Sequence, residues 1–341
     1  MTRVPNRTII ALALVCLLLL AGPVWNLAST TWTHRKNPVP GSFHSIGGYQ
    51  MHIHCTGSGS PAVVLEAAAS ATWLAWRRVQ PQLSQLTRVC SYDRAGHGWS
   101  EPRPGPRDAD HIVGELHDLL EKADLERPVV LVAHSAGGLY VREYARRFPT
   151  EVAGVPLLDT SSPQQLDALP GWRAAYEQNR RDYPARLRRE RLRVWSGWER
   201  LMRRCSVDDS SEGSAIVGQY AALMCRPAFV GGEESEYVFF EETSRQAARL
   251  ASFGGRPLLV VSRDPAAEKD RSAESVAQER AWDQEQERMK QLSPLSWRVV
   301  ARGGGHGVHH TRLELVVAEL TQLIEHLRGG PSPPFGTTVV R

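Results

Sequence analysis

The sequence is poor in lysine, and it lacks internal repeats, a glycine-rich phosphate loop and a metal-ligand motif. Of its 41 basic residues, 4 are lysine and 37 are arginine. The histidines of segments 51–55 and 306–310 have no carboxylate or cysteine at the spacing that a metal site requires. These absences argue against a metalloenzyme and a nucleotide-binding protein. We therefore expect neither a metal ion nor a cofactor.

Nucleic-acid-binding motifs are also missing, although the net charge of the 341-residue chain is +4. The densest basic stretch, residues 180–204, is interleaved with apolar residues at helical spacing. This pattern favours a solvated helix face over a surface for anionic lipid or nucleic acid. We expect no nucleic-acid partner, and the sequence leaves the oligomeric state open.

The first forty residues indicate a targeting or anchoring segment and a linker. Arg3 and Arg7 precede residues 9–25, a run without charge that is near the lower limit of a membrane span. No convincing cleavage site follows. An uncleaved membrane anchor with an exported catalytic domain is the preferred interpretation, and secretion after signal cleavage is the alternative.

Five cysteines are present, and one of them, Cys16, lies in the apolar N-terminal run. The other four permit disulfides in an oxidising compartment. Cys205 and Cys225 fall in a later helical stretch, where a bridge and two free thiols are equally acceptable. Cys55 and Cys90 lie in expected strands, and we expect them to be small buried thiols.

Strands and helices alternate from residue 43 onward. Expected strands cover 49–55, 62–67, 88–93, 128–134, 152–159, 256–262 and 296–302, and expected helices cover 73–86, 109–123, 137–148 and 313–327. Such alternation predicts an α/β fold with a mostly parallel sheet and helices on both faces.

One long stretch interrupts this alternation. Residues 163–250 are helical and arginine-rich with few strand-like runs, so they are interpreted as an insertion into one α/β domain formed by 41–162 and 251–328. The Gly/Pro-rich tail, 329–341, is expected to be disordered.

The segment AHSAG, residues 133–137, stands between an expected strand and an expected helix. It matches the nucleophile-elbow pattern Gly-x-Ser-x-Gly, with Ala133 in the first glycine position. The tight turn demands small flanking residues and exposes the Ser135 hydroxyl. It also directs the Ala136 N–H and the helix N-terminus toward an oxyanion beside the serine.

A serine nucleophile needs a base from elsewhere in the chain, and segment 302–311 follows the last strand with three histidines. His306 comes directly after flexible glycines and is the preferred base. His309 and His310 begin the final helix and are interpreted as surface residues or as supports of the base.

With these features the chain resembles a serine hydrolase of the α/β-hydrolase fold superfamily, over about residues 43–328. Segment 92–100, YDRAGHGWS, is similar to the D-x-x-G-x-G-x-S turn of many members, and segment 63–70 occupies the place of their His-Gly oxyanion loop. The resemblance implies that Ala69 and Ala136 donate the oxyanion hydrogen bonds. It also implies that 163–250 is a helical cap. The serine distinguishes the chain from related dehalogenases and epoxide hydrolases, which use aspartate at the elbow.

Two aspartates compete for the third position of the triad. Asp159 ends the strand after the elbow, and Asp264 follows the next strand. Most superfamily members carry the acid after the later strand, about two residues beyond Asp264, whereas some carry it at the earlier position. The sequence slightly favours Asp159, with Asp264 as the alternative.

The resulting hypothesis is two-step acyl transfer through Ser135 and His306. The leading function is hydrolysis of an ester, thioester or lactone of a small or lipid-like acyl substrate. An acyltransferase with the same residues and a catalytically silent binding protein are the alternatives.

Overall fold

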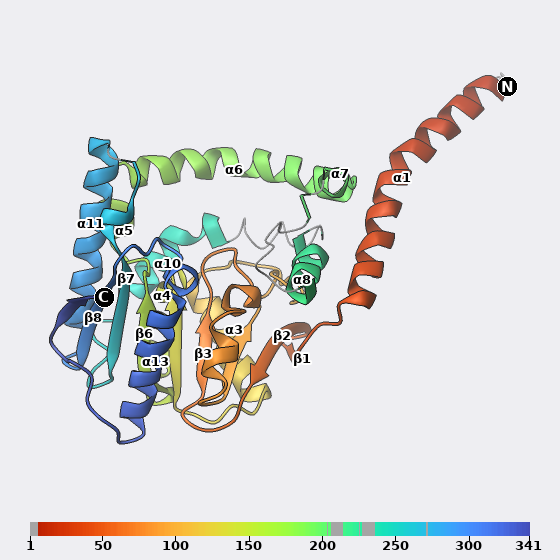
Figure 1. Cartoon of the computed structure of the whole chain (residues 1–341). Helices are drawn as coiled ribbons and strands as arrows, with labels where there is room; N and C mark the ends of the chain where they lie inside the picture. The colour runs from red at the N-terminus through yellow and green to blue at the C-terminus, as the bar shows by residue number, and fades with distance from the viewer. Residues whose placement is uncertain (1–5, 203, 206–213, 225, 227–235, 271) are drawn as a thin grey trace.

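A nine-stranded sheet forms the centre of the molecule (Figure 1), with strand order β1-β2-β4-β3-β5-β6-β7-β8-β9. The structure is a computed structural model that describes residues 6–202, 204–205, 214–224, 226, 236–270 and 272–341. The strands are β1 (Ser42–Ile46), β2 (Tyr49–Thr56), β3 (Val63–Glu66), β4 (Val89–Tyr92), β5 (Val129–His134), β6 (Val152–Leu158), β7 (Leu258–Arg263), β8 (Ser296–Ala301) and β9 (Thr338–Val340).

The sheet is mostly parallel, as the alternation of strands and helices predicts. β2 pairs antiparallel with both β1 and β4, and every other pairing is parallel. All six residues of β5 are buried. Burial on both faces explains why this strand is a continuous apolar run and not an alternating one. The predicted fold class is confirmed.

Helices cover both faces of the sheet. They are α2 (Gln80–Leu83), α3 (Ala109–Lys122), α4 (Gly137–Arg147), α11 (Ala273–Met289), α12 (Val308–Thr311) and α13 (Leu313–Leu327), with short 3-10 turns η1 (Trp73–Trp76), η2 (Pro149–Glu151), η3 (Pro265–Ala267) and η4 (Lys290–Leu292). On one face α3 and α4 bury Ile112 and Tyr144, and on the other α2 and α13 bury Leu83 and Leu320. These two cores hold the strand ends that carry the candidate site.

The chain between β6 and β7 contains helices α5 (Gln165–Ala168), α6 (Trp172–Trp195), α7 (Trp198–Leu201), α8 (Ser214–Met224) and α10 (Phe240–Ala247). Figure 1 shows α6 running across one end of the sheet. These helices account for the stretch that interrupts the alternation in the sequence.

The predicted helix over 73–86 is divided into η1 and α2, because the chain turns between them. The prediction of a disordered tail is wrong. Residues Thr338–Val340 form β9, which pairs with β8 from Arg298↔Thr338 to Val300↔Val340. The proline-rich segment before β9 packs Phe335 against Trp297, with ring centroids 5.6 Å apart. This contact and the strand pairing order the tail.

The prediction of free buried thiols at Cys55 and Cys90 is also wrong. The two residues face each other on the paired strands β2 and β4 and form a disulfide. Neighbouring strands bring directly opposed side chains within bonding distance, which the separate strand patterns do not reveal. Cys225 lies outside the described residues, as does any pairing of it with Cys205.

The N-terminal helix α1 (Asn6–Lys36) packs against the helices between β6 and β7. The side chains of residues 6–19 are not described, and they make up most of the expected anchor, 9–25. Within the described part of the chain, no helix meets the length and apolarity needed to cross a membrane.

Candidate active site

Ser135 occupies a sharp turn between β5 and α4. Its φ angle is +53°, in the left-handed region that side chains other than glycine rarely adopt. The turn brings other backbone very close. A Cβ atom on Gly137 would lie 2.8 Å from the Ala67 carbonyl oxygen, and one on Gly138 would lie 2.5 Å from Thr160 Cβ. The two glycines are therefore required by space, which explains the sequence that follows the serine.

The serine, a histidine and an aspartate meet at the carboxyl ends of the parallel strands. Ser135 follows β5, Asp159 follows β6, and His306 lies in the loop after β8. His306 Nε2 is 3.1 Å from Ser135 Oγ, and His306 Nδ1 is 2.6 Å from Asp159 Oδ2. The structure thus brings together three of the residues singled out in the sequence.

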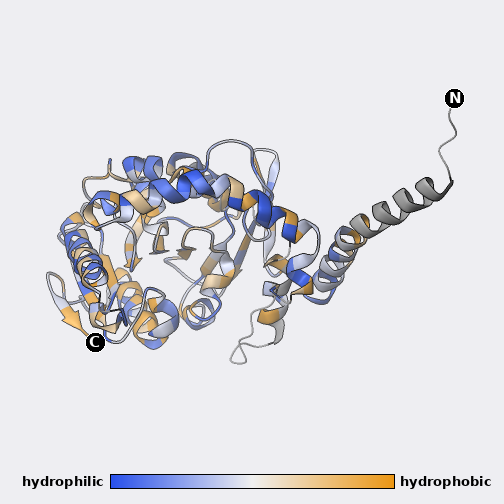
Figure 2. Cartoon of the chain, turned by 90° about the horizontal axis from the view of Figure 1, so that it is seen from above, coloured by the Kyte–Doolittle hydropathy of each residue, from blue (hydrophilic) through white to orange (hydrophobic). Residues whose placement is uncertain are grey.

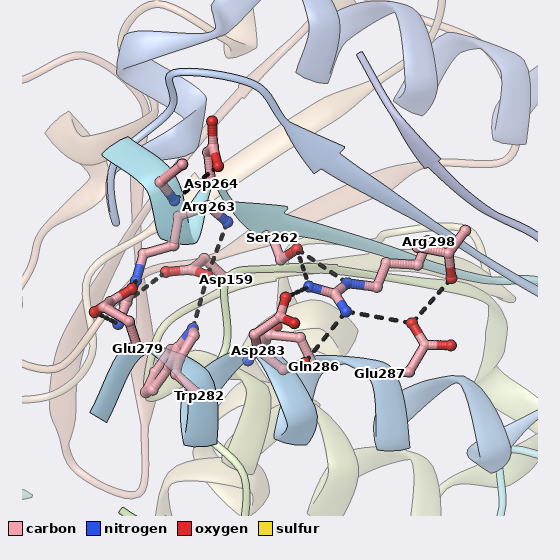
Figure 3. A network of polar contacts seen from close by, with 12 residues as sticks. Asp159, Ser262, Arg263, Asp264, Glu279, Trp282, Asp283, Gln286, Glu287 and Arg298 are labelled. Atoms are coloured by element: carbon pink, nitrogen blue, oxygen red, sulfur yellow. Dashed lines mark hydrogen bonds and ion pairs between the residues drawn. The ribbon is translucent and has the colours of Figure 1, made fainter. Parts of the chain in front are cut away.

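Asp159 is fully buried and accepts several hydrogen bonds. The Arg263 backbone N–H donates to Oδ1 at 3.0 Å, the Arg263 guanidinium donates to Oδ2 at 3.1 Å, and Trp282 Nε1 donates to Oδ1 at 2.8 Å. Figure 3 shows Asp159 between Arg263 and Trp282. Burial alone would raise the pKa of this carboxyl, but the hydrogen bond from His306 and the charge of Arg263 hold its pKa below the ordinary value.

The ionised state of Asp159 determines the tautomer of His306. A carboxylate only accepts hydrogen bonds, so His306 Nδ1 carries the proton that it donates to Asp159. The unprotonated Nε2 then faces the Ser135 hydroxyl. This is the arrangement in which an imidazole can remove the serine proton.

Asp264, the alternative acid, has other partners. Its Oδ1 accepts from the Ala266 N–H and its Oδ2 accepts from the Gly303 N–H, both at 2.9 Å. The Asp264 N–H in turn donates to the Gly304 carbonyl at 2.9 Å. Asp264 therefore joins the end of β7 to the glycine loop that precedes His306, and its carboxylate does not contact the imidazole.

Two further histidines lie behind His306. His134, which precedes the serine, donates from Nε2 to the His306 carbonyl oxygen at 2.9 Å. Burial, followed by the charge of His306, lowers its pKa to about 4. His309 is 2% exposed and its ring lies 4.4 Å from that of His134. His309 is thus not a surface residue, and it packs beneath the loop of the base.

The loop that contains Ala69 is held by a buried arginine from segment 92–100. Arg94 donates to the carbonyl oxygens of Ala67, at 3.1 Å, and Ala68, at 2.6 Å. In a trans peptide the C=O of one residue and the N–H of the next point in opposite directions. Because Arg94 binds the Ala68 carbonyl, the Ala69 N–H is directed away from Arg94, and Ala69 lines the cavity in front of Ser135.

The N–H groups of Ala69 and Ala136 are both unused: within the described part of the chain neither donates a hydrogen bond. Ala136 is the N-cap residue of α4 and lines the same cavity. Unpaired N–H groups that border a cavity beside a serine suit the binding of an oxyanion.

Arg94 also connects the sheet to the chain between β6 and β7. Its guanidinium pairs with Glu66 at the end of β3 and, at 2.6 Å, with Glu236 from the helical stretch. Glu236 in turn accepts from the Ser70 N–H at 3.1 Å. Burial opposes the charge of Glu236, but Arg94 overrides it and lowers the Glu236 pKa to about 2, whereas burial raises the pKa of Glu66. Sequence reasoning missed this network, and only the position of Arg94 inside the turn motif hinted at it.

A cavity of about 400 Å³ opens in front of Ser135. Its floor is formed by Ser135, His306 and the Ala69 and Ala136 backbone, and its remaining walls come mainly from the helices. The wall residues are Ser161, Gln165, Leu166, Trp172, Tyr176, Tyr237, Phe240, Arg263 and Trp282. Aromatic side chains dominate these walls, which suits an apolar substrate group.

In the part of the chain that the structure describes, one cluster has the geometry of a three-ligand metal site, formed by His117, Asp118 and Glu121 on α3. Two of the three side chains are exposed, and none lines the cavity. His117 Nδ1 already contacts Glu151 at 3.2 Å. The cluster therefore gives the candidate site no metal.

Comparison with known proteins places the chain in a family. The model of the alpha/beta hydrolase family matches residues 51–319, and the chain belongs to that family. The match includes the serine turn, both aspartates and the glycine loop with His306.

Individual relatives match the chain over different lengths. The uncharacterized protein YqjL of Bacillus subtilis is 24% identical over 80% of this chain and 87% of its own length. A 2-hydroxy-6-oxo-2,4-heptadienoate hydrolase of Pseudomonas putida is 32% identical, over 33% of this chain and 41% of its own. An uncharacterized protein of Schizosaccharomyces pombe is 42% identical, but the match covers 26% of this chain and 16% of that protein.

Solved structures show the same fold. An esterase from Thermogutta terrifontis superposes with a TM-score of 0.59 at 21% identity, covering 85% of this chain and 98% of the esterase. A putative epoxide hydrolase from Pseudomonas aeruginosa superposes with a TM-score of 0.63 at 18% identity, covering 84% of this chain and 96% of that protein. Both likenesses concern the fold alone.

Proposed function

We propose that the chain is a serine hydrolase that cleaves an ester, thioester or lactone through an acyl-enzyme on Ser135. The observation that supports this proposal most directly is the continuous hydrogen-bonded series from Ser135 to His306 to Asp159. It joins a nucleophile, a base and a buried carboxylate in the order that acyl transfer requires.

In the proposed reaction, His306 Nε2 takes the Ser135 proton while Oγ attacks the acyl carbonyl. Asp159 stabilises the imidazolium that forms, and the N–H groups of Ala69 and Ala136 bind the oxyanion. His306 then gives its proton to the leaving group, and the acyl group remains on Oγ. Water, activated by the same imidazole, releases the acid and restores the serine.

The cavity supports an apolar acyl or alcohol group as the preferred substrate part. Trp172, Tyr176, Phe240 and Trp282 provide flat apolar walls, and about 400 Å³ suffices for a small or lipid-like group. Among the described wall residues the only charged side chain is Arg263, whose guanidinium is already paired with Asp159 and Glu279.

The test is labelling with a fluorophosphonate, followed by turnover of p-nitrophenyl esters of increasing chain length. Ser135→Ala is expected to abolish labelling and to lower kcat by about 10⁵- to 10⁶-fold, because the triad acts as a unit. Ser161→Ala is the matched control, since Ser161 lines the same cavity and its hydroxyl makes no hydrogen bond to His306 in the described structure. Free acid released in plain buffer supports hydrolysis. A folded Ser135→Ala variant with near wild-type turnover would exclude the mechanism.

A further inference from the structure

Large apolar side chains are exposed where α1 meets the corner between α6 and α7. On α1 they include Leu20 (56% exposed) and Leu27 (70%), and on the corner Leu192 (64%) and Trp198 (47%). Other exposed members are Val24, Trp25, Trp32, Trp195, Leu201 and Met202. We call these ten residues the apolar corner. So many exposed large side chains in one place indicate an interaction surface.

The two parts of the apolar corner form one surface because the helices are joined closely. Asn26 donates to the Val194 carbonyl at 2.8 Å, and Arg200 donates to Thr30 Oγ1 at 3.0 Å. A Cβ atom on Gly22 would lie 2.1 Å from the Ser196 carbonyl oxygen, so the backbones touch. Figure 1 shows α7 beside α1.

A cavity of about 370 Å³ lies across the junction. It is lined by Pro23, Val24, Leu27 and Trp195, among others. The exposed apolar surface is therefore continuous from one helix to the other.

Arginines share this surface. Arg188, Leu192 and Trp195 follow one another at intervals of four and three residues, so they lie on one face of α6, and all three are exposed. Residues 186–202 contain six arginines and two glutamates, a balance of +4. The surface at the apolar corner therefore combines apolar and basic side chains.

From this composition we propose that the apolar corner docks on the surface of an anionic phospholipid bilayer, in place of the solvated helix face that the sequence pattern of residues 180–204 favours. Tryptophans are favoured at the membrane–water interface, where one edge of the ring is apolar and the other polar. Arginines beside them reach anionic headgroups. The uncharged run 9–25 of the same helix α1 shares Leu20, Val24 and Trp25 with the apolar corner, so the corner would extend that run onto α6 and α7.

A second copy of the chain fits the surface less well. In a two-fold symmetric dimer the same patch meets itself, so arginines such as Arg188 and Arg193 would face other arginines across an apolar contact. Like charges brought together in this way oppose association. The charge therefore favours lipid as the partner.

The test uses the full-length chain with vesicles that carry brominated lipid as a quencher of tryptophan fluorescence. The variant Trp195→Phe/Trp198→Phe is expected to lose the part of the quenching that these two side chains contribute. Trp76→Phe is the control, because Trp76 is fully buried and its Nε1 has no hydrogen-bond partner in the described structure. Quenching that is the same in the double variant and the wild type would overturn the proposal.

Charge is tested with Arg188→Gln/Arg189→Gln/Arg193→Gln in vesicles with and without phosphatidylglycerol. Each arginine lost is expected to weaken docking of the corner about fivefold on anionic vesicles. The control, Arg245→Gln/Arg249→Gln/Arg288→Gln, removes equal charge from exposed positions elsewhere. Equal effects of both triple variants would refute a specific lipid contact.

Sedimentation of the same proteins without lipid tests the competing partner. The wild type could instead be a dimer that dissociates in Trp195→Phe/Trp198→Phe and show no quenching by lipid. That result would identify the partner as a second copy of the chain and not a bilayer. These readouts need no turnover, so their results do not depend on the proposed hydrolase activity. Circular dichroism checks that each variant is folded.

Discussion

The sheet and the helices between β6 and β7 build opposite sides of one cavity, but they are held by different contacts. Ser135, Asp159 and His306 lie at the ends of strands embedded in two large apolar cores. The helices have much smaller buried clusters, one of them formed by Tyr183, Leu187 and Val194 with Tyr237 packed against it. Hydropathy colouring shows the same contrast, with hydrophilic residues frequent on the helix that crosses the sheet (Figure 2).

The sheet side therefore positions the reacting groups, and the helical side shapes the cavity. Reacting groups need fixed geometry, which strand ends in a dense core supply. The helical side depends more on a few polar attachments, such as the buried pair of Arg94 and Glu236. We therefore expect changes on the sheet side to act mainly on rate or global stability, and changes on the helical side to act more locally.

The largest expected effect is the difference in kcat between the asparagine variants of the two aspartates. Asp159→Asn keeps the size of the side chain but removes the charge that orients His306, and kcat for an ester should fall by about 10⁴-fold. Asp264→Asn should keep near wild-type turnover, because its partners are the Ala266 and Gly303 N–H groups. Steady-state kinetics with urea unfolding of both variants provides the measurement. The reverse ranking of the two losses would assign the acid to Asp264.

Removal of Arg94 should break the attachment between the two sides. Arg94→Gln leaves the buried carboxylates of Glu66 and Glu236 without their partner and is expected to cost about 3–5 kcal/mol in the free energy of unfolding. Release of the Ala68 carbonyl should also lower kcat. Arg245→Gln breaks an exposed pair with Glu242 and should change stability by less than about 0.5 kcal/mol.

If Arg94→Gln does not fold, Glu236→Gln replaces it, since that change leaves no carboxylate at position 236. Urea titrations and ester kinetics measure both effects. Equal stability of Arg94→Gln and Arg245→Gln would show that the buried network does not hold the loop.

Leucine truncations compare the two packing regions directly. Leu131→Ala in β5 should cost about 2–5 kcal/mol of global stability, because Leu131 is fully buried in the larger core. Leu187→Ala in α6 should cost less globally and should instead increase local opening of α6. Hydrogen exchange with mass spectrometry distinguishes these outcomes. Faster exchange in β5 of the Leu187→Ala protein would mean that the two regions unfold as one unit.

The last expected effect is a change in stability that develops only at acid pH. Glu236 is buried, which opposes ionisation, but Arg94 lowers its pKa from 4.5 to about 2. As pH falls below about 4.5 the unfolded chain takes up a proton that the folded chain does not, so stability decreases toward pH 2. Asp159 contributes in the same direction.

Glu236→Gln should therefore flatten the acid limb of a plot of unfolding free energy against pH. Glu241→Gln, at a more exposed ion pair with Arg173, serves as control and should leave the limb unchanged. An acid limb of equal slope in Glu236→Gln and the wild type would argue against an ionised Glu236.

Local sequence patterns determined the strand and helix order, the turn at Ser135 and the loop of His306. A strand, a tight turn and a helix are specified by neighbouring residues, so their pattern is visible without a structure. The α/β fold follows from the repetition of such units. By itself the sequence also left Asp159 and Asp264 as rivals, because both end a strand at the same edge of the sheet.

Tertiary structure decided what depends on distant parts of the chain. It placed Asp159 against His306 and used Asp264 to hold the loop before the base. Through β2 and β4 it paired Cys55 with Cys90, and it added the tail to the sheet as β9. It also joined Arg94 to Glu236, 142 residues away. Each of these contacts depends on which strands and loops become neighbours in space, and no local spacing encodes that.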